Sequence, residues 1–137
     1  MTTNQPHRPG TTNPRVDPFA AYALAWPTLN AEETDDALAE LEDWIDWLRD
    51  RYHLDHRHLP DCWAQHGELI EELSALHTAW QHSYAPDADG SAPLRWHDAF
   101  DAGRQRLLGW VARTGCRPDN HREHPMLHHL NSARDAY

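Results

Sequence analysis

Four cysteine and histidine side chains in two separate segments are the residues of this chain best suited to chemistry. Cys62 and His66 stand four positions apart, and Cys116 and His121 stand five apart in a later segment. On a helix, a spacing of four places two side chains on the same face. If the segments meet, they offer two thiolates and two imidazoles, the composition of a closed structural zinc site. We therefore predict that these four residues bind one structural zinc ion.

Other interpretations of the same residues stay open. Cysteine is often buried as a small apolar residue, and among 12 histidines some coincidence of Cys and His is expected. A disulfide between Cys62 and Cys116 is a second alternative. His124 competes with His121 for the fourth ligand position, and the sequence does not separate them; we slightly favour His121.

A catalytic metal ion has less support in the sequence. His66-Gly67-Glu68 matches half of the zinc deaminase signature, but the P-C-x-x-C half is missing. A small metal-dependent hydrolase, with three protein ligands and a metal-bound water, would use Glu68 or Asp98 as its base. The sequence contains no H-E-x-x-H, G-x-S-x-G or glycine-rich phosphate-loop motif. We therefore assign no catalytic residue and favour a protein that is not an enzyme.

Composition and net charge limit the classes of partner that this chain is expected to bind. The 137 residues are enough for one domain, and 22 acidic against 12 basic residues give a formal charge of −10. This charge opposes direct binding to nucleic acid and favours a protein partner, or an acidic protein that covers a partner's nucleic-acid site. No apolar run reaches the length of a membrane span, and two cysteines are too few for a disulfide framework. We expect a cytoplasmic protein.

Apolar periodicity predicts three main helices, over residues 30 to 52, about 62 to 84, and 91 to 114. Asn30 opens a capping box for the first helix, and Gly115 is placed to end the third in the left-handed conformation. The expected core stripes are Leu38, Leu41, Trp44, Ile45, Leu48 and Tyr52; His66, Leu69, Ile70, Leu73, Leu76, His77 and Trp80; and Trp96, Phe100, Leu107, Leu108, Trp110 and Val111.

These helices predict an all-α fold, a small bundle with short terminal helices and a disordered N-terminal tail. Residues 1–16 are polar and rich in proline, so we assign them to the tail, and residues 17–137 to a single helical domain. One short helix is expected before Pro27, and another from Pro125 to Leu130.

The turn-rich residues 85–93 predict an antiparallel pairing of the second and third helices. That pairing places the start of one helix beside the end of the other, so Cys62 and His66 are expected near Cys116. The two half-sites should therefore meet.

Seven tryptophans are many for this length, and most fall on or beside the core stripes. Trp47 lies beside the charged Asp46 and Arg49 and is harder to bury in a bundle of three helices. With Trp26, it is the predicted partner-binding surface.

Several short motifs resemble those of a group of small uncharacterised actinobacterial proteins, many of them carried on conjugative, plasmid or phage-derived elements. The motifs are Leu59 to His66, Glu72 to Trp80, Trp96 to Asp98, Arg104 to Trp110, and Gly115-Cys116 followed by His121. The resemblance covers about residues 44–124. It implies an accessory or regulatory role on a mobile element, and it implies no reaction.

Overall fold

The computed structural model of this chain describes residues 22–118 and 120–122. The main helices are α1 (Ala31–Tyr52), α2 (Gly67–Ser83) and α3 (Ala92–Thr114), with short 3-10 helices η2 (Trp26–Thr28) and η3 (Trp63–Gln65). The predicted all-α fold with three main helices is confirmed. The predicted tail, the terminal helix from Pro125 and the alternative ligand His124 lie outside the described residues. No helix in the described part combines the length and apolar character needed to cross a membrane.

Both ends of α1 form as local sequence predicts. The Asn30 side chain accepts a hydrogen bond from the Glu33 amide (2.8 Å), and the Glu33 carboxylate accepts one from the Asn30 amide (2.9 Å). This capping box satisfies two amides that have no partner within the helix. At the other end, His53 takes a left-handed conformation with φ 55° and turns the chain out of the helix.

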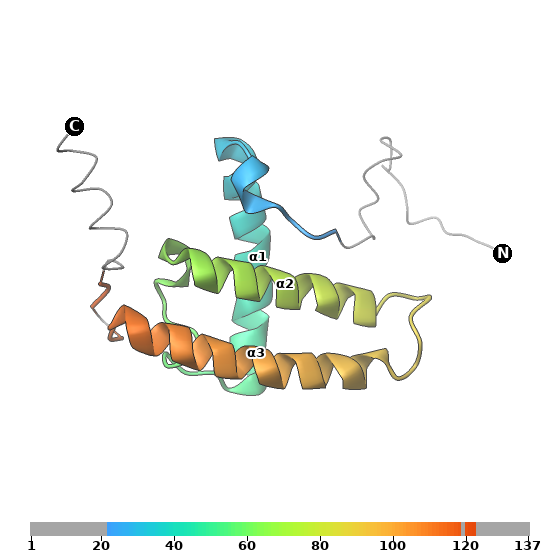
Figure 1. Cartoon of the computed structure of the whole chain (residues 1–137). Helices are drawn as coiled ribbons and strands as arrows, with labels where there is room; N and C mark the ends of the chain where they lie inside the picture. The colour runs from blue at the N-terminus through green and yellow to red at the C-terminus, as the bar shows by residue number, and fades with distance from the viewer. Residues whose placement is uncertain (1–21, 119, 123–137) are drawn as a thin grey trace.

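Helices α2 and α3 run antiparallel, and α1 crosses this pair (Figure 1). As a result, the start of α2 and the end of α3 lie at the same end of the pair, as predicted. The shared core contains apolar side chains of all three helices and of the connection between α1 and α2: Leu41, Trp44, Ile45, Leu48, Leu54, Leu59, Trp63, Leu69, Leu73, Leu76, Trp96, Phe100, Leu107 and Val111.

Polar contacts fix the register between α2 and α3. Trp96 Nε1 donates a hydrogen bond to the Leu76 carbonyl (3.0 Å). Arg106 binds both oxygens of the buried Glu72 carboxylate, at 2.7 and 2.9 Å. The backbone of Gly103 approaches α2 so closely that a Cβ there would lie 2.9 Å from a Glu72 oxygen. Because burying an unpaired carboxylate is costly, the bidentate contact with Arg106 offsets the cost of burying Glu72.

Three expectations from the sequence are wrong in detail. Helix α2 begins at Gly67 rather than near Cys62, because His66 is extended (φ −127°, ψ 112°) and interrupts helical geometry. Leu108, expected in the core, is 36% exposed because the third helix buries only the stripe containing Leu107 and Val111. Of the short helix predicted over residues 17–29, the described part contains only the single 3-10 turn η2.

The two tryptophans predicted to form one surface differ in exposure. Trp47 is exposed, whereas Trp26 is half-buried and packs against the core. Trp26 and Trp47 therefore do not form one exposed surface.

Candidate metal centre

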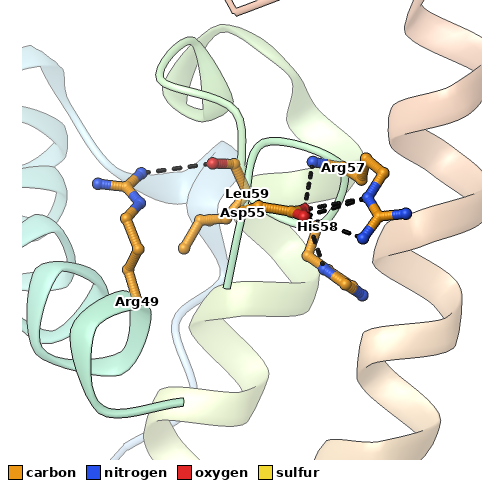
Figure 2. Close-up of polar contacts among 5 residues, drawn as sticks. All are labelled: Arg49, Asp55, Arg57, His58 and Leu59. Atoms are coloured by element: carbon orange, nitrogen blue, oxygen red, sulfur yellow. Dashed lines mark hydrogen bonds and ion pairs between the residues drawn. The ribbon is translucent and has the colours of Figure 1, made fainter. Parts of the chain in front are cut away.

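The connection between α1 and η3 is shaped by a compact set of polar contacts (Figure 2). Asp55 accepts hydrogen bonds from the Arg57 amide (3.0 Å) and from the Arg57 guanidinium (3.0 Å at Nη2), and these hold the pKa of Asp55 at about 2. The His58 Nδ1 lies 3.6 Å from the same carboxylate. Arg49 on α1 reaches the Leu59 carbonyl at 3.5 Å. With Leu59 buried, this connection delivers Cys62 to the start of η3.

Cys62 and His66 flank the single 3-10 turn of η3. The Trp63 amide donates to the Pro60 carbonyl, and the His66 amide donates to the Trp63 carbonyl. Cys62 Sγ lies 3.5 Å from His66 Nε2, so the two side chains converge as predicted. The predicted reason for this convergence, a shared face of an α-helix, was wrong. The two residues meet across a 3-10 turn that is followed by the extended backbone of His66.

Cys116 is held by the residues that end α3. Gly115 takes the left-handed conformation (φ 74°) predicted for it. Thr114 Oγ1 donates to the Val111 carbonyl (2.7 Å) and accepts from the Cys116 amide (3.1 Å). These contacts bury Cys116 and direct its sulfur toward α2, where it lies 3.5 Å from both Cys62 Sγ and His66 Nε2.

A tight turn returns the chain from Cys116 to His121. Arg117 and Asn120 exchange two backbone hydrogen bonds of 3.0 Å. His121 Nδ1 consequently lies 3.6 Å from Cys116 Sγ, and the next amide, that of Arg122, donates to the same sulfur at 3.2 Å. Neither the Arg122 amide nor the Thr114 contact was predicted, because both depend on how the chain turns after α3.

The structure brings all four predicted ligands together. One ligand atom from each of Cys62, His66, Cys116 and His121 lies within 4.8 Å of every other, and the group can hold a metal ion. His66 and Cys116 are buried, Cys62 is partly buried, and His121 is exposed. Both cysteines are free thiols, with their sulfurs 3.5 Å apart rather than at the roughly 2.05 Å of a disulfide.

The two thiols differ in acidity. Burial and the hydrogen bond with Cys116 raise the pKa of Cys62 to about 11. At Cys116, burial acts to raise the pKa, but hydrogen bonding from Thr114, the Arg122 amide and Cys62 outweighs burial and lowers the pKa. Cys116 therefore becomes a thiolate first, with Cys62 as its donor. A metal ion must displace the Cys62 proton in order to bind there.

A surface pocket of about 360 Å³ adjoins this centre. Its lining includes Cys116, the apolar Val111, and the cationic Arg57, Arg117 and Arg122. It gives solvent and small molecules an approach to the side of the centre that carries Cys116.

The two candidate bases lie in different places. Asp98 is on the first half of α3, 16 residues before Thr114, which corresponds to about 24 Å along the helix. This distance excludes Asp98 as a base for chemistry at the cluster. Glu68 lies at the second position of α2, two residues after His66, and is partly buried.

No protein-family model, no curated protein and no solved structure matches this chain.

Proposed function

We propose that this chain is a non-enzymatic interaction protein whose helical fold is fastened by one structural zinc ion. The observation that carries the zinc assignment is the convergence of Cys62, His66, Cys116 and His121, whose ligand atoms lie within 4.8 Å of one another. Thiolate ligands also suit the reducing cytoplasm that composition favours.

The spacing of the ligand atoms supports zinc in particular. A tetrahedral zinc ion with Zn–S of about 2.3 Å and Zn–N of about 2.0–2.1 Å requires S···S near 3.8 Å and S···N near 3.6 Å. The corresponding distances are 3.5 Å between the sulfurs, 3.5 Å from each sulfur to His66 Nε2, and 3.6 Å from Cys116 to His121. These four of the six distances lie within a few tenths of an ångström of that geometry, whereas the two that join His121 to Cys62 and to His66 are within 4.8 Å, so His121 is the ligand that would move on binding.

A structural role follows from the number of ligands. Four protein ligands fill a tetrahedral site and leave no position for water. Two of them precede α2 and two follow α3, so the ion would join the open end of the α2–α3 pair. It would also anchor the turn that carries His121, a segment with little apolar content.

A small metal-dependent hydrolase is the second candidate. It is favoured by the exposure of His121 and by the pocket beside Cys116, because loss of His121 would open a coordination position to water. Glu68 is then the available base. The accessory role on a mobile element, implied by the resemblance, belongs to the first proposal and stays a prediction.

Metal analysis of full-length protein purified without chelator tests the assignment. We expect about one zinc per chain, and X-ray absorption should show two sulfur and two nitrogen neighbours. His66→Ala should abolish zinc binding and lower the Tm by roughly 10 °C or more, whereas His97→Ala, at an exposed position on α3, should do neither. The proposal would be contradicted if the purified protein contained no metal and His66→Ala had the same Tm as the parent protein. Outer-shell imidazole scattering from one histidine instead of two would favour the hydrolase.

A further inference from the structure

Three aromatic side chains, which we call the aromatic strip, form a continuous group at the surface: Trp47 on α1, Trp80 on α2, and Tyr84, which directly follows α2. The ring centroid of Trp80 lies 5.1 Å from that of Trp47 and 5.2 Å from that of Tyr84. Trp47 is 41% exposed and Tyr84 is 53% exposed, with Trp80 partly buried between them. Large aromatic groups exposed together at one place are typical of a binding surface.

The strip is presented by rigid elements. Buried Trp44 lies beneath it, with ring centroids 6.3 Å from Trp47 and 6.0 Å from Trp80. Tyr52 contacts the edge of Trp47 at 6.1 Å. Because the rings are already ordered by packing between helices, a ligand would lose little free energy in fixing them.

Helix α1, which carries Trp47, is strongly acidic. The helix carries nine Asp and Glu residues against two Arg residues, a formal charge of −7. Asp43 and Asp50 stand four residues before and three after Trp47, so helical spacing places both beside its ring, and both are exposed. Arg49 and Arg51 are the two cations of α1, and Arg51 stands four residues after Trp47. The other nearby carboxylate, Asp46, pairs with Arg49 at 3.4 Å.

From this combination we infer that the aromatic strip, with Asp43 and Asp50, binds an arginine-rich segment of a partner protein. A guanidinium group can stack on an aromatic ring and pair with a carboxylate at the same time. An apolar side chain could pack on the rings but could not pair with the carboxylates. The charge of α1 also complements a basic segment and repels nucleic acid and anionic membranes. The inference rests on the proposed interaction function and names the chemistry of the partner.

The strip and the metal centre are separate. Tyr84 directly follows α2, whereas the metal ligand His66 directly precedes it, so the length of the helix, about 25 Å, lies between them. Substitutions in the strip should therefore leave zinc content unchanged. Failure of one assignment does not imply failure of the other.

A labelled peptide of alternating arginine and serine provides the probe, with fluorescence anisotropy of the peptide as the measurement on zinc-loaded, full-length protein. We expect binding that weakens as salt rises, and weaker binding of the matching lysine peptide because an ammonium group cannot stack as a guanidinium does. Trp47→Ala and Tyr84→Ala should each weaken binding about tenfold. Zinc content and helix content by circular dichroism of both variants should match those of the parent protein, although the lost packing of Trp47 should lower the Tm of Trp47→Ala.

Two double variants on α1 separate a local site from the general charge of the helix. Asp43→Asn with Asp50→Asn should weaken peptide binding about tenfold, whereas Asp35→Asn with Asp36→Asn, which removes the same charge farther from Trp47, should change it less than about twofold. Equal weakening by both pairs, or binding unaffected by Trp47→Ala, would overturn the inference. A self-association that Trp47→Ala abolishes would also overturn it, because a second copy would then occupy the strip.

Discussion

Cys62 Sγ lies 3.5 Å from Cys116 Sγ, although 54 residues separate the two cysteines in the chain. The antiparallel pairing of α2 and α3 produces this proximity, since Cys62 precedes one helix and Cys116 follows the other. A metal ion shared by the two cysteines would close a long loop in the unfolded chain. The closure lowers the entropy of the unfolded state and therefore stabilises the fold.

Replacement of His121 by alanine should reveal the fourth ligand. His121 Nδ1 lies 3.6 Å from Cys116 Sγ, so we expect His121→Ala to weaken zinc binding by about a hundredfold or more, measured by competition with a chromophoric chelator. His124→Ala is the matched control and should leave the affinity unchanged. The reverse result would assign the fourth position to His124.

The Arg106–Glu72 contact should contribute measurably to stability. Arg106→Ala leaves the buried Glu72 carboxylate without its bidentate partner, and we expect a loss of about 1–3 kcal/mol in the free energy of urea unfolding. Gln105→Ala, at the adjacent exposed position, should change it by less than about 0.5 kcal/mol. Adding Glu72→Leu to Arg106→Ala should recover stability, because no buried charge then remains. If the double variant were less stable than Arg106→Ala alone, the proposed cause would be wrong.

Two glycines on α3 should respond oppositely to alanine. A Cβ at Gly103 would lie 2.9 Å from a Glu72 oxygen and 3.0 Å from Leu76 Cδ1, whereas a Cβ at Gly109 would meet nothing within 4 Å. Thermal unfolding should show Gly103→Ala destabilised by about 1–3 kcal/mol through overpacking. Gly109→Ala should be stabilised by about 0.5–1 kcal/mol through its helix propensity. Stabilisation by both substitutions would contradict close packing at Gly103.

His77 should make the fold sensitive to acid. Burial lowers the pKa of His77 to about 4, and its ring stacks on Trp44 with centroids 4.8 Å apart. The unfolded chain takes up this proton near pH 6.5, so stability present above that pH is lost as pH falls from 6.5 toward 4. The loss should be about 2 kcal/mol, less than the full shift implies because His77 is partly exposed.

Urea unfolding of His77→Phe at pH 7 and pH 4.5 checks this pH dependence. Phenylalanine keeps an aromatic ring beside Trp44 and has no proton to gain, so the variant should lose less stability on acidification than the parent protein. Release of metal in acid affects both proteins and cancels in the comparison. Identical losses in the two proteins would exclude His77 as the cause.

Features that depend on a few adjacent residues could be predicted from the sequence alone. Asn30 and Glu33 form the predicted capping box, and Gly115 ends α3 in the predicted left-handed conformation. Apolar spacing correctly identified three helices and most of their buried faces. The types of the four candidate ligands were also evident, because thiols and imidazoles carry their metal chemistry wherever they lie.

The contacts between residues distant in the chain could be seen only in the folded structure. A spacing of four fits both an α-helical turn and the 3-10 turn with an extended residue that joins Cys62 to His66. Glu72 is buried in an ion pair with the exposed Arg106, 34 positions later in the chain, and no local pattern indicates that pairing. Backbone propensity acts over a few residues, whereas burial and ligand convergence depend on which helices pack together, and this packing is fixed by the whole chain.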